Sequence, residues 1–173
     1  MRCQVIFRVL TSILLCTIAA TAQTQEPERL TEVDLQVKGV GLGTPYAQML
    51  RQFGGPISSR REKIDDETCS PPHTLLTLNY KGAVLELVGD PQGRDFKVVS
   101  LEVTSPQLLI TPGIKIGMSE QDARSKLGGE PWRVRNDSGF RVLDYVTKGN
   151  DGGAGLYFRN GRLVKIQWAY TAC

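Results

Sequence analysis

Hydrophobic and polar residues alternate with two different periods along the chain. Just after residue 44 the apolar side chains recur at the three- and four-residue spacing of a helix, on a face formed by Tyr46, Met49, Leu50 and Phe53. The period then changes to the two-residue alternation of half-buried strands, at residues 74–80, 83–88 and 96–104. This order predicts a short helix followed by an antiparallel meander, and a small entry strand is expected around Val33, Leu35 and Val37.

The same order of periods returns in the second half of the chain. Residues 119–128 have the helical spacing again, with a thinner apolar face that consists of Ala123 and Leu127. Strand-like alternation follows at residues 140–147, 155–159 and 162–170. The last two strands are separated by Asn-Gly, which is a strong signal for a tight hairpin.

Capping residues predict where the two helices begin and end. Thr44 is a suitable N-cap for the first helix, and Ser119 with Asp122 resembles a capping box at the start of the second. Gly54 and Gly128 are expected to end the helices because glycine adopts the left-handed cap conformation without strain.

A duplicated motif accounts for the recurrence. Residues 39–55 and 113–129 align without a gap, and four pairs of glycines coincide: Gly39 with Gly113, Gly43 with Gly117, Gly54 with Gly128, and Gly55 with Gly129. The sequence therefore predicts an α+β fold of two tandem repeats, residues 33–108 and 109–173, each a short helical segment packed on a three- to four-stranded antiparallel sheet. We expect the two sheets to lie side by side and form one extended surface, which favours binding over catalysis.

These motifs carry a resemblance to a known family. The glycine-bounded helix, the Gly-Gly-Pro or Gly-Gly-x-Pro exit and the alternating strand at residues 163–169 resemble the small outer-membrane-assembly lipoproteins. The tandem form, over residues 33–173, is similar to the β-lactamase inhibitor protein family, which implies two repeats that clamp a partner protein. The lipid-attachment signal of the assembly lipoproteins is missing here. The inhibitor family has one disulfide in each repeat, whereas this chain offers a single possible pair of cysteines.

The amino terminus has the layout of an export signal. Arg2 and Arg8 precede an apolar run at residues 9–20, and a small-x-small sequence ends at Ala22. The run is shorter than the roughly 20 residues that span a bilayer, so we favour a cleaved signal peptide at residues 1–22 over a membrane anchor. A flexible lead-in is expected at residues 23–32. The mature protein would then be periplasmic or secreted, without a stable membrane anchor.

Two cysteines remain after such cleavage. Cys69 and Cys173 would meet an oxidising compartment, which favours a single structural disulfide between them. The alternative is a free or intermolecular thiol at Cys173, because terminal residues are often mobile.

Charge and composition argue against several functional classes. The net charge of +3 would fall to +1 when Arg2 and Arg8 leave with the signal peptide, which is too low for a nucleic-acid-binding protein. His73 is the only histidine, and the two prolines before it do not give the spacing of a metal site or a catalytic triad. We therefore predict no metal, no cofactor and no enzymatic activity.

Strand alternation suggests which side chains are free to meet a partner. On the last strand, Val164, Ile166 and Trp168 are expected beneath the helix. The opposite face of the second repeat would carry a candidate partner-binding set: Arg141, Tyr145, Tyr157, Arg159, Lys165 and Gln167. The matching set in the first repeat is polar and acidic: Thr77, Asn79, Glu86, Ser100 and Glu102. The alternative is an ordinary solvated sheet face.

Taken together, these patterns predict a non-enzymatic exported module that binds another protein, and we expect it to be a monomer. The favoured interpretation is an inhibitor of, or an immunity protein for, a secreted or cell-wall hydrolase. The alternative is a scaffold component in envelope or outer-membrane assembly.

Overall fold

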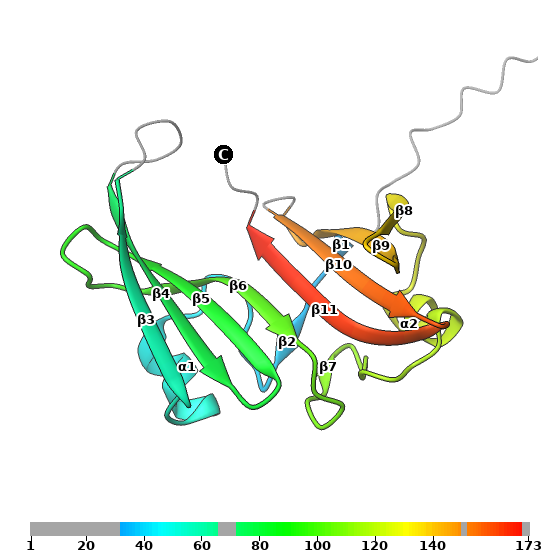
Figure 1. Ribbon diagram of the computed structural model, residues 1–173, viewed down its shortest axis with the longest axis horizontal. Coiled ribbons are helices and arrows are strands. Elements are labelled where there is room, and N and C mark those ends of the chain that lie inside the picture. The colour runs from blue at the N-terminus through cyan, green and yellow to red at the C-terminus, as the bar shows by residue number, and fades with distance from the viewer. Residues whose placement is uncertain (1–31, 66–71, 150–151, 171–173) are drawn as a thin grey trace, which may run out of the picture.

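The computed structural model describes residues 32–65, 72–149 and 152–170 (Figure 1). In chain order the elements are β1 (Glu32–Val33), β2 (Gln36–Val37), α1 (Tyr46–Phe53), β3 (Ser58–Ile64), β4 (His73–Tyr80), β5 (Ala83–Gly89), β6 (Lys97–Val103), β7 (Ile110–Thr111), α2 (Glu120–Leu127), β8 (Arg133–Asp137), β9 (Phe140–Thr147), β10 (Gly152–Arg159) and β11 (Arg162–Tyr170). The predicted signal peptide, Cys69 and Cys173 lie outside the described residues. Within them, no helix is long and apolar enough to cross a membrane.

Over the described residues the fold is mixed α+β, with one large sheet and two short helices. Nine strands form the sheet in the order β1-β9-β10-β11-β6-β5-β4-β3, and β8 also pairs with β9. Neighbouring strands are antiparallel except β1, which runs parallel to β9. The short strands β2 and β7 form a separate two-stranded sheet.

One strand pair joins the two halves of the sheet, and we call it the seam. Strands β6 and β11 pair antiparallel with the register Val103–Ile166, Glu102–Gln167, Leu101–Trp168 and Ser100–Ala169. We refer to residues 36–103, with α1 and β3–β6, as the first half, and to residues 110–170, with α2 and β8–β11, as the second half.

The loop before each helix is attached to its own half in the same way. The amide of Gly43 donates to the Val98 carbonyl at 2.8 Å, and the amide of Gly117 donates to the Leu163 carbonyl at 2.7 Å. Both glycines have positive φ angles, 78° and 95° respectively. The last two strands of each half also carry an irregularity at corresponding places, after Glu86 in β5 and after Tyr157 in β10.

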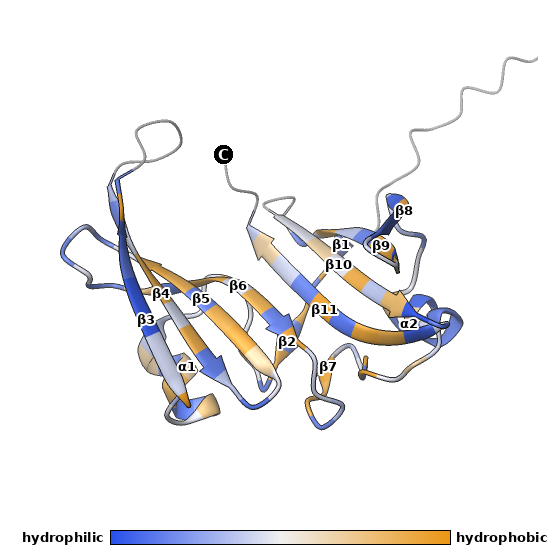
Figure 2. Cartoon of the chain, in the orientation of Figure 1, coloured by the Kyte–Doolittle hydropathy of each residue, from blue (hydrophilic) through white to orange (hydrophobic). Residues whose placement is uncertain are grey.

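The six strands predicted from alternation are present, and the large sheet contains two more that were not predicted, while β7 of the small sheet was not predicted either. Strands β9 and β11 have the predicted bounds, whereas β3 and β8 were not predicted. Both additional strands are at the outer edges of the sheet and are rich in polar residues (Figure 2). An edge strand has one unpaired side and little to bury, so its sequence lacks the apolar alternation of a central strand.

The helix termini agree with the sequence in part. Ser119 is the N-cap of α2, where its hydroxyl accepts from the Asp122 amide at 3.1 Å, and Gly128 closes the helix in the left-handed conformation. The prediction for Thr44 is wrong, because α1 starts after Pro45 without a side-chain cap. The Thr44 hydroxyl instead accepts from the Gly41 amide at 3.1 Å and closes the preceding loop. Gly54 has a φ of 78°, but its ψ of −163° lies outside the left-handed region.

Both helices cover the same face of the sheet, and a single core fills the space between. Met49 of α1 and Ala123 of α2 are fully buried and belong to one hydrophobic cluster with side chains from both halves of the sheet. Leu85, Leu101 and Trp168 form a row across the seam on this face. We call this the helix side and the opposite surface the open face.

The cap of α2 yields a stability prediction. Ser119→Ala should lower the free energy of unfolding by about 1 kcal/mol, because it removes the acceptor for the Asp122 amide. Ser125→Ala, in the same helix at an exposed position, is the matched control and should leave stability unchanged or raise it by a few tenths of a kcal/mol. Denaturant titration measures both, and equal effects would contradict the capping role.

Candidate functional site: the open face of the second half

The open face of the first half carries the polar set that the sequence predicts. Thr77, Glu86 and Ser100 lie opposite one another across β4, β5 and β6. Asn79 and Glu102 lie in the next row, on either side of Val84. Their chain neighbours, such as Leu78 and Leu85, are buried on the helix side. The predicted register of this half is therefore correct.

An aromatic and cationic cluster occupies the open face of the second half. The ring of Tyr157 has the Lys165 Nζ 4.2 Å from its centroid and the Arg135 guanidinium carbon at 6.0 Å. Phe140 meets the same ring edge-on, with 6.0 Å between centroids, and Arg159 lies 4.3 Å from the Phe140 ring centroid. Cation–π contacts of this kind hold the long side chains in place without removing their charge.

Carboxylates fix the two cations nearest Tyr157. Arg135 forms ion pairs with Asp144 and Asp137, both at 2.8 Å. The hydrogen bond to Asp144, followed by the one to Asp137, raises the pKa of Arg135, and the hydrogen bond from Arg135 lowers the pKa of Asp137. Lys165 reaches across the seam to Glu102 at 3.2 Å. These ion pairs hold two cationic side chains beside the Tyr157 ring, which favours electrostatic recognition of a partner.

A shallow hollow adjoins this cluster. Small residues on β10 and β11, among them Gly153, Gly155 and Ala169, line it, and Trp132 and Tyr157 stand at its sides. Its volume is about 360 Å³. A Cβ at position 155 would lie 3.0 Å from the Tyr157 ring, so glycine there allows the ring to lie close over the strand. The hollow has room for one large side chain of a partner.

Trp132 is a site residue that the sequence analysis missed. Its side chain is 52% exposed, which is unusual for the largest apolar residue, and Arg133 lies 6.0 Å from its ring. Trp132 precedes β8, whose polar sequence gave no strand signal. The available clue was its position directly after Pro131, outside any predicted strand, where burial in the core was not expected.

Four of the six predicted partner-binding residues belong to this face or its end. Tyr157, Lys165 and Gln167 are in the open-face rows of β10 and β11, and Arg159 contacts Phe140 at the end of β10. Gln167 also lines the hollow.

The prediction for Tyr145 is wrong. Tyr145 lies opposite Ala154, which lies opposite Trp168, so its ring is on the helix side and is fully buried. Burial raises its pKa to about 12, and its hydroxyl is 3.4 Å from the Gly129 carbonyl. Strand β9 is apolar on both faces, and Val142 and Leu143 are both buried. Its sequence pattern therefore did not indicate which face of the sheet Tyr145 occupies.

Arg141 is also on the helix side, opposite Phe158. It binds Glu120 at 2.8 Å, and Arg124 binds the same carboxylate at 3.0 Å. Burial acts to raise the pKa of Glu120, but the hydrogen bonds from Arg141 and Arg124 outweigh it and lower the pKa below its ordinary value. Arg141 therefore joins β9 to the first turn of α2 and does not face a partner across the open face.

The expected position of Val164 beneath the helix is a third correction. The register between β10 and β11 shifts after Tyr157, so that Tyr157 pairs with Lys165 and the next residue pairs with Leu163. Val164 is the extra residue and is only half-buried, while Leu163 is fully buried in its place. Ile166 and Trp168 lie on the helix side as predicted.

No protein-family model and no curated protein matches the chain. A solved structure from Streptococcus mutans, proposed to be a beta-lactamase inhibitor protein, is similar at 24% identity and a TM-score of 0.27. The similarity covers 72% of this chain and 82% of that one.

The two tyrosines of the second half provide a test of the register. Tyr145→Ala should lower the free energy of unfolding by about 3–5 kcal/mol through lost burial and a cavity. Tyr157→Ala, its control on the opposite face, should cost about 1 kcal/mol or less, because that ring is half-exposed. Thermal or denaturant unfolding measures both. A larger loss of stability for Tyr157→Ala than for Tyr145→Ala would mean that the assignment of these side chains to the two faces is wrong by one residue.

The Glu120 ion pairs predict a dependence of stability on pH. Because the folded-state pKa of Glu120 is lowered, its stabilising contribution is complete above the unfolded pKa of roughly 4.3 and is lost as the pH falls through the folded pKa. Glu120→Gln should therefore be less stable than the wild type by about 1 kcal/mol at pH 7, and the difference should shrink on acidification. A difference that stays constant with pH would contradict this role.

Proposed function

We propose that the chain is an exported protein-binding module, without catalytic activity, that receives its partner on the open face of the second half. The observation that carries the proposal is the hollow beside Trp132 and Tyr157, with Arg135 and Lys165 held in place next to it. Tyr, Trp and Arg dominate interface hot spots because each buries a large area while retaining a polar group. An exposed Trp beside a hollow that is already formed in the free protein is typical of such a hot spot.

We further propose that the two halves are tandem repeats of one unit. The aligned glycines, the equivalent hydrogen bonds of Gly43 and Gly117, and the irregularities at corresponding places in β5 and β10 all support a duplication. Duplication would give the partner a single surface with two chemistries. The first half would offer the carboxylates of Glu86 and Glu102, and the second would offer the cationic and aromatic cluster.

The class of partner is inferred from the expected location. A signal peptide at residues 1–22 would deliver the protein to the periplasm or the exterior, where a Cys69–Cys173 disulfide could form. A compact binding module there fits an inhibitor of, or an immunity protein for, a secreted or cell-wall hydrolase. A scaffold role would instead predict that the protein fractionates with membranes.

The test compares variants as bait in envelope extracts. Trp132→Ala and Tyr157→Ala should each weaken capture of the partner by about 2 kcal/mol or more, which is roughly 30-fold in affinity. Ile57→Ala is the matched control, since Ile57 is 74% exposed but belongs to the first half, outside the hollow. Equal capture by the wild type and by all three variants would rule out the open face of the second half as the site.

A further inference from the structure

Strand β3 forms a long edge of the large sheet. It pairs with β4 over all seven of its residues, and it is the last strand in the sheet (Figure 1). On its outer side, β3 is paired with none of the described residues, and most of its side chains are exposed. Such an edge can accept a further strand, because its outer backbone N–H and C=O groups are left without partners in the sheet.

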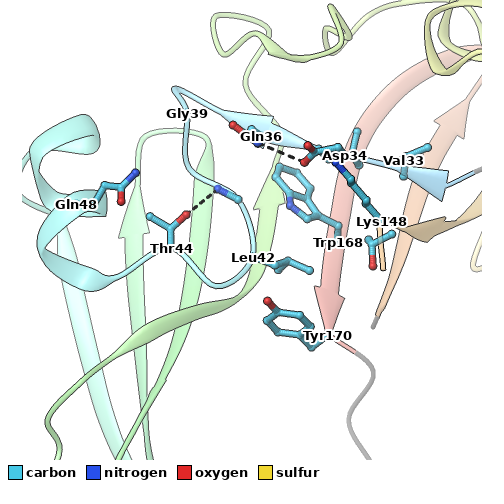
Figure 3. Close-up of a pocket in the computed structure, with 13 residues that line it drawn as sticks. Val33, Asp34, Gln36, Gly39, Leu42, Thr44, Gln48, Lys148, Trp168 and Tyr170 are labelled. Atoms are coloured by element: carbon cyan, nitrogen blue, oxygen red, sulfur yellow. Dashed lines mark hydrogen bonds between the residues drawn. The ribbon is translucent and has the colours of Figure 1, made fainter. Parts of the chain in front are cut away.

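The opposite edge of the sheet is less suited to pairing with another strand, because two shorter strands share it. Strand β8 pairs with β9 over five residues, and β1 pairs with the end of β9 over two. After β1 the chain leaves this edge and crosses the helix side, where Asp34 and Gln36 lie beside Trp168 (Figure 3). In the part of the chain that the structure describes, β3 is therefore the longer free edge.

Alternation determines which residues of β3 direct their backbone groups outward. The Ile57 amide donates to the Asn79 carbonyl at 2.8 Å, so Asn79 directs its backbone groups toward β3. Ser58 lies opposite Asn79, and its own backbone groups therefore point toward β4. Because the direction alternates along an antiparallel strand, three residues point their N–H and C=O groups away from the sheet: Ser59, Arg61 and Lys63.

The charged side chains of β3 are self-complementary about Arg61. Arg60 lies on the open face opposite Thr77, and Glu62 lies on the same face two residues later. Their side chains are 74% and 38% exposed and form an ion pair within the chain. When a second β3 lies antiparallel with Arg61 opposite Arg61, Arg60 of each chain is opposite Glu62 of the other. Opposite charges in directly opposed positions stabilise a sheet, whereas like charges destabilise it.

In this register the two copies of Arg61 are opposite one another, but their side chains reach away from the edge. The Arg61 guanidinium carbon lies 5.3 Å from the Phe96 ring centroid, over the helix side of its own chain. A Cβ at position 93, in the loop before Phe96, would lie 3.4 Å from Nη1 of Arg61. The two guanidinium groups are therefore drawn apart, and the repulsion between them is reduced.

We propose that β3 is a dimer interface, at which two copies of this chain pair their β3 strands antiparallel about Arg61. A two-fold axis perpendicular to the sheet then joins two nine-stranded sheets edge to edge, in place of the monomer expected from the sequence. Both open faces point in the same direction. The interface is independent of the proposed function, because β3 and the hollow beside Trp132 lie at opposite ends of the sheet.

Sedimentation equilibrium of the purified protein tests the proposal. A reducing agent is present, so that no disulfide links two chains. The average mass should rise from that of one chain toward that of two as the concentration increases. Added salt should weaken the dimer, because the side chains of Arg60 and Glu62 are exposed to solvent. A mass that stays at one chain up to the solubility limit would overturn the proposal.

Charge exchange tests the register. Arg60→Glu should weaken the dimer at least tenfold, because it places like charges opposite one another on both sides of Arg61, and it also provides the chain as a monomer. Combining Arg60→Glu with Glu62→Arg exchanges the two charges and should restore the dimer. Lys115→Glu, at an exposed lysine of the second half, changes the net charge equally and should leave the dimer unchanged. A dimer that survives Arg60→Glu, or that the double exchange does not restore, would overturn the proposal.

A proline variant and nuclear Overhauser effects test the backbone pairing. Ser59→Pro removes an amide that points outward, so the chain should stay folded, as thermal unfolding can show, while the dimer weakens at least tenfold. In samples that mix labelled and unlabelled chains, an Hα–Hα contact between Arg60 and Glu62 should appear between molecules, because the Cα atoms of such opposed residues are about 4.5 Å apart. A dimer without this contact would overturn the proposal.

Discussion

The pairing of β6 with β11 is the constraint on which the rest of the architecture depends. This seam places Leu101 opposite Trp168 on the helix side and Glu102 opposite Gln167 on the open face. Because side chains alternate along a strand, the register of this pair determines the face of each residue on β6 and β11 up to the irregularity that each strand carries. The seam therefore gives both halves a common core and a common open face, and Lys165 reinforces it through Glu102.

The two helices explain why one face remains available. Each has eight residues, and together they cover only the helix side, where their few apolar side chains meet the sheet. An antiparallel sheet can leave its other face to solvent or to a partner. In the second half this face is not simply polar, because the aromatic rings of Phe140 and Tyr157 are held there beside fixed cations.

The sequence was sufficient for the central strands and for α2, because their alternation and capping signals agree with their burial. It was insufficient where the apolar pattern of a strand does not indicate which of its side chains are buried. The edge strands β3 and β8 bury too little to show a pattern, and Tyr145 lies in a strand that is buried on both faces. The extra residue at Val164 shifts the parity within β11.

The seam can be tested most directly by nuclear Overhauser effects across it in the isotopically labelled, monomeric protein. The account predicts backbone contacts between Leu101 and Trp168 and between Val103 and Ile166, within one molecule. Samples that mix labelled and unlabelled chains distinguish these contacts from contacts between molecules. If the contacts are missing, or arise only between molecules, the two halves do not share one sheet. The common open face proposed for partner binding would then not exist in the single chain.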